Sequence, residues 1–295
     1  MCAVQIGMNL PVMVPGLDRA RILAWARAID AGPFSSLAAG ERITFPNPEI
    51  MVTLAAAAAV TERVRLVPTV VVLPMHAAGL IAKQIATLDV LSNGRVTLGV
   101  GVGARAEDFR AVGAVFDQPK LRRLEAQVAD LRRAWAGEPI VPHAAPIEPR
   151  PLQPGGPPLL MGALAAASIR RAARWADGIC GFSFGPSLDE IAAAFETARA
   201  AWRAAGRSAP PRLVTSCWFA LGPSPRAQMD TYVGRYLNFL GPGVAEQVAP
   251  ACSLTSAARL RDAVRAIADL GCDELILVPT TLDVDELARV ADAVG

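Results

Sequence analysis

Three glycines alternate with valines at the end of a β-branched segment: Gly99, Gly101 and Gly103. Glycine has no Cβ, so a flat or anionic ligand can approach this backbone closely while the amide groups remain free to face it. The alternative is that these glycines only relieve crowding inside a barrel or bend a strand. The segment is therefore a candidate ligand site, with a purely structural role as the competing interpretation.

Side chains that catalyse reactions without a cofactor are scarce. His76 and His143 are the two histidines, and the five cysteines include no C-x-x-C pair, which argues against a metal site, a disulfide framework and a serine triad. The lysines, Lys83 and Lys120, do not fall at expected strand ends, which argues against a barrel lyase or isomerase that works through a Schiff base. We therefore expect no metal and a reaction that depends on an organic cofactor.

The composition indicates an α/β enzyme scaffold. Of the 295 residues, 53% are hydrophobic and 5% aromatic, which suits small helices packed on a buried sheet. The 29 basic and 27 acidic residues form no basic stripe, so nucleic acid is not an expected partner. The apolar runs 51–60 and 67–74 are about half of a membrane span, and no signal peptide is evident. We expect a cytoplasmic protein without a membrane segment that acts on a small-molecule substrate.

Strand-like and helix-like segments alternate along the whole chain in eight pairs. The expected strands are 4–9, 34–38, 64–73, 96–102, 158–162, 178–182, 212–220 and 274–278. The expected helices are 18–29, 48–61, 78–91, 121–135, 166–175, 188–205, 257–270 and 284–293. Eight pairs in a chain of this length predict one α/β domain over 1–295, a (β/α)8 TIM barrel rather than an open doubly wound sheet.

Two segments do not fit this repeat. Residues 137–156 follow the fourth helix and are rich in proline and glycine, which suggests an excursion that forms a short hairpin. Residues 224–250 follow the seventh strand and look helical. Because barrel active sites form at the carboxyl ends of the strands, we expect the second insertion to act as a lid or a substrate wall.

The pattern G-x-G-x-x-A over 99–104 formally satisfies a dinucleotide fingerprint, but that fingerprint should open the first βαβ unit and three strand–helix pairs precede it here. A closer match involves residues 48–103. They contain, in order, an alanine-rich helix, TERVRL, a strand ending in LP, AKQIATLDVLSNGR and the glycine-rich strand end. This series of features resembles the bacterial luciferase-like monooxygenase family. Residues 157–178 and 260–279 are similar to two further segments of that family, so the resemblance covers most of the chain.

The resemblance implies a (β/α)8 barrel that binds FMN or the deazaflavin coenzyme F420 at its C-terminal mouth, with the ring near strands three and four. Members of the family transfer hydride or oxygenate small organic substrates. In the family the third strand carries a bulge behind the ring, often with a non-proline cis peptide, and the matching residues here are Thr69 and Val70. An ordinary trans strand is the alternative at this position.

The resemblance also implies cofactor contacts after strands four and five. The amides expected to face the cofactor after strand four are those of Gly101, Val102 and Gly103. Arg105 would neutralise a phosphate or carboxylate tail, or else lie in solvent. Gly162 and Ala163 precede a helix whose free N-terminal amides would cradle a phosphate. The family usually has two glycines there, so the alanine leaves the geometry of this cradle open.

After strand two, many family members carry an acidic residue and then a histidine, whereas this chain has Glu41 and Arg42. Glu41 could accept a hydrogen bond from the ring or carry a proton, and Arg42 could hold an anionic substrate or pair with Glu41. A structural ion pair at the barrel rim is the alternative. His76, just beyond strand three, is a further catalytic candidate unless it is structural. Asn9, at the end of strand one, is a candidate contact to the ring or substrate.

Two residues of the matched signature and four aromatic residues are expected outside the catalytic and cofactor-binding set. Asp89 and Arg95 belong to the matched signature but lie where a helix turns into the fourth strand, at the bottom face, so they are assigned to stability. Four aromatic residues near strand ends could line an apolar substrate pocket, although at least two are expected in the core: Phe182, Phe184, Trp218 and Phe219.

We predict an oxidoreductase in which F420 exchanges hydride with a small organic molecule, because alanine- and arginine-rich single-chain members of this family often belong to its deazaflavin branch. The alternatives are an FMN-dependent monooxygenase and a relative that binds a flavin without catalysis. Family barrels often pair through helices near strands two and three. The alanine-rich face 54–60 could therefore form a homodimer interface, or be buried inside one subunit.

Overall fold

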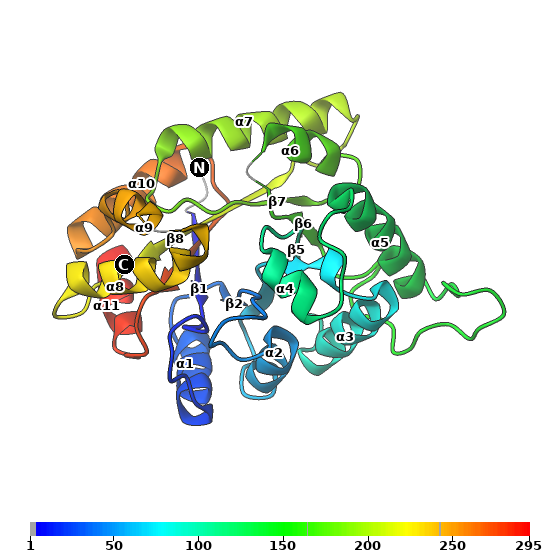
Figure 1. Cartoon of the computed structure of the whole chain (residues 1–295), viewed down its shortest axis with the longest axis horizontal. Helices are drawn as coiled ribbons and strands as arrows, with labels where there is room; N and C mark the ends of the chain where they lie inside the picture. Colours follow the sequence, from blue (N-terminus) through cyan, green and yellow to red (C-terminus); the bar gives the residue numbers. More distant parts are fainter. Residues whose placement is uncertain (1–3, 164, 242) are drawn as a thin grey trace.

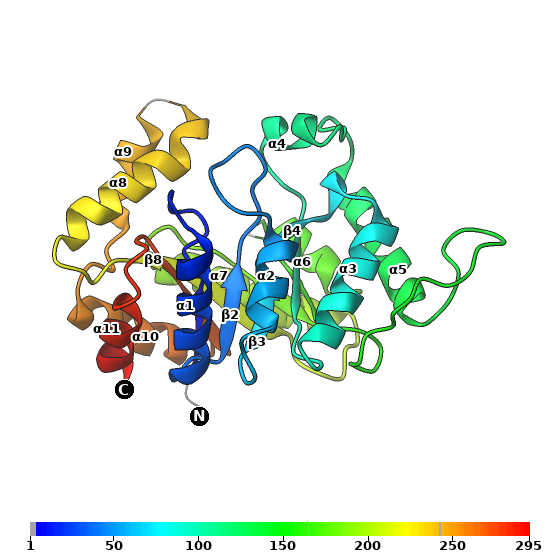
Figure 2. The same cartoon turned by 90° about the horizontal axis from the view of Figure 1, so that it is seen from below.

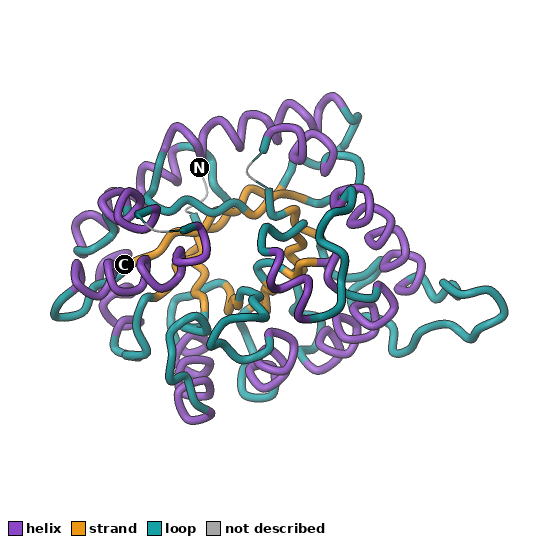
Figure 3. Tube along the Cα trace, in the orientation of Figure 1, coloured by secondary structure: helices purple, strands orange, loops and turns teal. Residues whose placement is uncertain are grey.

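The computed structural model describes residues 4–163, 165–241 and 243–295. Within them, parallel strands form a central ring that helices surround (Figure 1 and Figure 3). The described strands pair in the order β3-β2-β1-β9-β8-β7-β6-β5-β4. They are β1 Gln5–Asn9, β2 Ser36–Ala39, β3 Arg65–Pro68, β4 Val71–Val72, β5 Leu98–Gly101, β6 Leu159–Met161, β7 Gly178–Cys180, β8 Arg212–Phe219 and β9 Glu274–Pro279.

The two ends of this order, β3 and β4, are consecutive in the chain. They are separated by Thr69 and Val70, which are joined by a cis peptide bond. Because β3 pairs with β2 while β4 pairs with β5, the two short strands are halves of the third barrel strand, and together they close the sheet. The predicted (β/α)8 TIM barrel is confirmed, and so is the cis peptide expected in its third strand.

Helices cover the outside of the ring. They are α1 Arg19–Ala31, α2 Ile50–Ala58, α3 Ala78–Leu91, α4 Ala106–Ala111, α5 Lys120–Trp135, α6 Ala166–Ala172, α7 Leu188–Ala204, α8 Pro225–Leu237, α9 Val244–Val248, α10 Ala257–Asp269 and α11 Glu286–Val294. Successive strand residues point alternately into the barrel and toward the helices. Ala38 and Val67 accordingly pack in a small interior cluster, whereas Leu37 and Leu66 join the large core shared with the helices.

The insertion after β8 is helical, as predicted. It contains α8 and α9 together with the short 3-10 turns η2 Asn238–Leu240 and η3 Ala249–Ala251. Figure 2 shows α8, α9 and α4 at one end of the barrel and both chain termini at the other. The strands run toward the first of these ends, so the insertion covers part of the mouth where barrel active sites form.

Two further segments differ from the prediction, and a third leaves its prediction open. Residues 137–156, all of them described, form a loop without strands that extends away from the barrel (Figure 1), so the expected hairpin is wrong; its many prolines cannot donate to a strand ladder. Helix α4 is absent from the expected elements, because six residues are too few to show a helical period. Within 54–60, Leu54 and Ala57 are buried in this chain, whereas Ala56 and Ala59 are exposed, so burial accounts for part of the alanine-rich face and the homodimer stays a prediction. No helix among the described residues is both long and apolar enough to cross a bilayer.

Candidate active site

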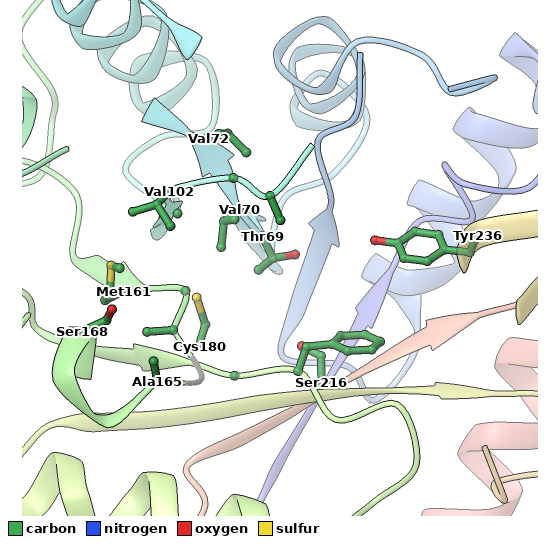
Figure 4. Close-up of a pocket in the computed structure, with 17 residues that line it drawn as sticks. Thr69, Val70, Val72, Val102, Met161, Ala165, Ser168, Cys180, Ser216 and Tyr236 are labelled. Carbon is green, nitrogen blue, oxygen red and sulfur yellow. The ribbon is translucent and has the colours of Figure 1, made fainter. Parts of the chain in front are cut away.

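A cavity of about 460 Å³ opens at the carboxyl ends of the strands. Figure 4 shows Thr69 and Val70 on one side of it and Tyr236 reaching in from another. This volume is typical of a small-molecule site. Seven residues expected to contact a cofactor line the cavity: Thr69, Val70, Gly101, Val102, Gly103, Gly162 and Ala163.

The glycines around this cavity also have a packing role. A Cβ on Gly101 would lie 2.7 Å from Val70 Cγ2, and a Cβ on Gly162 would lie 2.6 Å from Val70 Cγ1. A Cβ on Gly99 would lie 2.7 Å from the carbonyl oxygen of Pro68. Both interpretations of the glycine run therefore apply, because Gly101 lines the cavity while making room for Val70, and Gly99 relieves crowding in the barrel.

The expected phosphate cradle is wrong in one respect. The Gly162 amide donates a hydrogen bond to the Val100 carbonyl at 2.7 Å, so it extends the sheet and is not free to bind a phosphate. The cavity wall continues through Ala163, Ala165 and Ser168, where the chain enters α6. Ser168 adds a hydroxyl group to this side of the cavity.

Several lining residues were not predicted from the sequence, and Tyr236 is the most prominent. It comes from α8, where its ring stacks on Tyr232 with centroids 5.8 Å apart. The available signal was the spacing of Tyr232, Tyr236 and Phe239, which places three aromatic rings on one helical face of the insertion. Ser216 and Cys180 also line the cavity. Burial raises the pKa of the Cys180 thiol to about 12, so this cysteine stays protonated and is a poor nucleophile.

Glu41 and His76 form a pair beside the main cavity. Glu41 Oε1 lies 2.8 Å from His76 Nε2, and its other oxygen accepts a hydrogen bond from the Val72 amide at 2.7 Å. The Glu41 side chain is only 3% exposed, against 19% for His76. The structure therefore joins two of the predicted catalytic residues, and it pairs Glu41 with His76 rather than with Arg42.

Arg42 and Arg105 line a second pocket of about 170 Å³, which shares Val72, Gly103 and Tyr236 with the main cavity. Burial lowers the pKa of Arg42, and the nearby positive charge of Arg105 lowers it further. Arg105 is half-buried, with its Nε 3.2 Å from Asp108 Oδ2, so it is not the freely solvated residue of the alternative interpretation.

Asp108, which also lines this second pocket, is buried and ionised. Burial by itself would raise its pKa, but hydrogen bonds from the Thr44 hydroxyl and amide, together with the charges of Arg105 and Arg42, hold the pKa of Asp108 below its usual value. The carboxylate thus fixes the loop after β2 and the guanidinium of Arg105.

Asn9 lines a third pocket of about 70 Å³ that shares Thr69, Ser216 and Tyr236 with the main cavity. Its side chain is 6% exposed, and its Oδ1 has no hydrogen-bond partner among the described residues. A buried acceptor without a donor is uncommon and costs free energy unless a ligand satisfies it.

The predicted aromatic wall is only partly present. Phe182 lines the main cavity and Trp218 lines the third pocket, whereas Phe219 lies in the core and Phe184 is 37% exposed.

The sequence model for luciferase-like monooxygenases matches residues 5–288 of this chain. The chain belongs to this family. The expectation of an oxidoreductase or monooxygenase family is therefore confirmed. The luciferase-like chain is 32% identical to 4-hydroxyprotoasukamycin monooxygenase from Streptomyces nodosus subsp. asukaensis over 203 aligned residues. The alignment covers 62% of this chain and 54% of that protein. The match thus spans about half the length of this relative.

Solved structures of low sequence identity share the fold. An F420-dependent secondary alcohol dehydrogenase, in complex with an F420–acetone adduct, superposes with a TM-score of 0.81 and 16% identity over 100% of both chains. The oxygenating constituent of 3,6-diketocamphane monooxygenase from Pseudomonas putida, in complex with FMN, has a TM-score of 0.73 and 17% identity over 99% of this chain and 96% of that chain. A protein named with F420 and a protein named with FMN thus share this fold.

The luciferase-like resemblance places an acidic residue and a histidine next to each other after the second strand. In this chain the acid is present there as Glu41, but the imidazole that contacts it comes from His76, beyond the third strand. Arg42 follows Glu41 in the sequence and turns instead toward the Tyr236 backbone, whose carbonyl accepts from its Nη1 at 3.3 Å. The arrangement can therefore hold a proton at the Glu41–His76 pair and a positive charge beside it.

Proposed function

We propose that this luciferase-like protein exchanges hydride between coenzyme F420, bound in the main cavity, and a small organic substrate. The observation that supports the proposal most is a cavity of about 460 Å³ bounded by the cis peptide at Thr69 and Val70 and by the glycine-rich end of β5. The unpartnered Asn9 Oδ1 and the hydroxyl groups of Ser168 and Ser216 fit the polar atoms of a heterocycle and its side chain.

When bound, F420 supplies a ring carbon that gives or accepts hydride, whereas FMN in the same place also allows reaction with dioxygen. The residues of the chain perform the other tasks. Thr69 and Val70 would support the ring, and Tyr236 would exclude water from the mouth. Glu41 Oε1 and His76 Nε2 lie 2.8 Å apart, so this pair is the candidate to take up or release the proton that accompanies oxidation of an alcohol or reduction of a carbonyl.

An FMN-dependent monooxygenase is the second candidate. It is favoured by the 32% identity to a protein named as a monooxygenase. The two candidates differ in the cofactor and in whether oxygen is consumed, so a binding titration separates them.

The test is quenching of tryptophan fluorescence by F420 and by FMN. We expect a micromolar or lower Kd for F420 and at least about tenfold weaker binding of FMN. Replacing Ala165, which lines the cavity and is exposed, by phenylalanine should weaken F420 binding. Ala166→Phe, at the adjacent exposed position outside the lining, is the matched control. Preference for FMN would support the second candidate, and absence of binding to either would overturn both.

A further inference from the structure

The second pocket has an excess of unused hydrogen-bond donors. Arg42 is 8% exposed, and its Nε has no partner among the described residues. The buried Nη1 of Arg105 is likewise without a partner among those residues. Both side chains line the same space of about 170 Å³. Buried donors of charged groups are rarely left unpaired, because each lost hydrogen bond costs free energy.

Aromatic rings fix the position of both guanidinium groups without satisfying these donors. Arg42 Cζ lies 4.0 Å from the centre of the Phe45 ring and 5.0 Å from that of Tyr236. Both arginines contact Phe239, at 5.2 Å from Arg42 Cζ and 4.2 Å from Arg105 Cζ. Contact with ring faces holds a guanidinium group in one orientation and leaves the N–H groups at its edge available for an acceptor.

The two carboxylates that line the pocket are already engaged. Asp108 accepts hydrogen bonds from the Thr44 amide and hydroxyl and from Arg105 Nε. Glu41 accepts from the Val72 amide and contacts His76. Neither carboxylate accepts a hydrogen bond from the Nε of Arg42 or the Nη1 of Arg105. The pocket therefore presents two fixed cationic groups whose free donors point to an anionic acceptor from outside the chain.

We propose that Arg42 and Arg105 bind the carboxylate of the substrate, so that this luciferase-like protein acts on small organic acids. The inference rests on the proposed function, because the reacting carbon of the same molecule then lies in the adjoining main cavity. A carboxylate is favoured over a neutral polar group because an arginine edge matches its two oxygens. A phosphate of the cofactor carries the same oxygen chemistry, and the experiment separates these two sources.

The test measures binding of benzoate and of benzamide, which has the same shape but no charge, by isothermal titration calorimetry with and without F420 or FMN. We expect benzoate to bind the wild-type protein at least about tenfold more tightly than benzamide. Arg42→Gln and Arg105→Gln should each weaken benzoate binding at least about tenfold and leave benzamide binding unchanged. Arg110→Gln removes the same charge from an exposed residue of α4 outside the pocket and should change neither affinity.

The outcomes distinguish this inference from the proposed function. If cofactor binds but benzoate shows no preference over benzamide, the carboxylate site is refuted and the cofactor proposal stands. If Arg42→Gln weakens cofactor binding while benzoate binding is unaffected, the pocket serves the cofactor phosphate and the inference is overturned. If neither cofactor binds, the proposed function fails, and benzoate binding to the cofactor-free protein still decides the inference. Arg42→Lys keeps the charge without the planar edge, so a benzoate affinity between those of the wild type and Arg42→Gln is expected.

Discussion

Arg95 and Arg42 are two arginines held largely out of solvent at opposite ends of the barrel. Arg95, near the bottom, donates hydrogen bonds from all three nitrogen atoms of its guanidinium group. The acceptors are the Ser92, Thr61 and Val64 carbonyls and the Thr61 hydroxyl, at donor–acceptor distances of 2.6 to 3.1 Å. Arg42, at the mouth, donates one hydrogen bond of 3.3 Å to the Tyr236 carbonyl. Burial lowers the pKa of both arginines, so the difference lies in how many acceptors the chain supplies.

Carboxylate and amide oxygens at the two ends differ in the same way. Asp89, fully buried near the bottom, accepts from the Gln153 amide at 3.0 Å, from Gln153 Nε2 at 2.7 Å and from the Val96 amide at 3.4 Å. The buried Asn9 Oδ1 at the mouth accepts from no described residue. In these two pairs of residues the chain satisfies the polar group near the bottom and leaves the one at the mouth open, which costs stability. Arg212 Nε, at the start of β8, is an exception near the bottom, because it also lacks a partner among the described residues.

The largest expected effect of this difference is on stability. Arg95→Gln should lower the free energy of unfolding by about 3 kcal/mol, because it leaves the Thr61 and Val64 carbonyls without donors, whereas Arg42→Gln should lower it by about 1 kcal/mol or less. Urea unfolding followed by tryptophan fluorescence measures both values. Equal losses for the two variants would show that the two ends of the barrel do not differ in this respect.

A second prediction concerns the packing behind the cavity. Gly162→Ala should lower the free energy of unfolding by about 2 kcal/mol, because its Cβ would lie 2.6 Å from Val70 Cγ1 and 3.2 Å from the Val100 carbonyl oxygen. Gly181→Ala is the matched control, since it lines the same cavity and its Cβ would meet nothing closer than 3.6 Å. Adding Val70→Ala to Gly162→Ala should restore part of the loss in thermal unfolding. No restoration would mean that Val70 is not the source of the crowding.

The bottom of the barrel was the easier end to predict from the sequence. The alternation of strands and helices predicted the eight-stranded barrel, and helix 78–91 was predicted with the bounds that α3 has. The placement of Asp89 and Arg95 at the bottom follows from local chain order, because both lie next to the turn that precedes the fourth strand. Their hydrogen-bond partners did not follow in this way, because Asp89 accepts from Gln153, 64 residues away, and Arg95 donates to the Thr61 and Val64 carbonyls, 34 and 31 residues away.

The mouth was harder to predict, because part of its lining comes from the insertion after β8, for example Tyr236 and Phe239. An ion pair between Glu41 and its neighbour Arg42 was one of the alternatives, but the partner of Glu41 is His76, 35 residues away. Arg42 and Arg105 were each identified as anion contacts, yet nothing in the sequence indicates that Phe239, from an insertion more than a hundred residues later, contacts both. The insertion was recognised as a substrate wall, but the residues of that wall depend on how α8 packs across the mouth.

The pH dependence of stability provides a third, smaller test at the mouth. The pKa of Asp108 is held below its ordinary value of 3.8, because hydrogen bonds from Thr44 and the charges of Arg105 and Arg42 outweigh the effect of burial. A depressed pKa means that Asp108 stabilises the fold above pH 3.8 and loses this effect as the pH falls through its folded-state value. Asp108→Asn should therefore be about 1.5 kcal/mol less stable than the wild type at neutral pH, with the difference shrinking as the pH falls below 3.8. A difference that does not change with pH would contradict this assignment.

The smallest expected effect on stability is at Asn9, where stability and binding should change in opposite directions. Asn9→Leu removes the unpartnered Oδ1 from a buried position at similar volume, so the free energy of unfolding should stay the same or rise by about 1 kcal/mol. If a bound cofactor or substrate supplies the missing donor, the same substitution should weaken cofactor binding in the fluorescence titration by about tenfold.

Thr61→Val, near the bottom, is the contrasting control, because it removes a hydroxyl that both donates to the Ala57 carbonyl and accepts from Arg95. That variant should lose stability and keep its cofactor affinity. If Asn9→Leu also loses stability without any change in binding, the open acceptor at the mouth is a structural group and the difference between the two ends does not extend to strand β1.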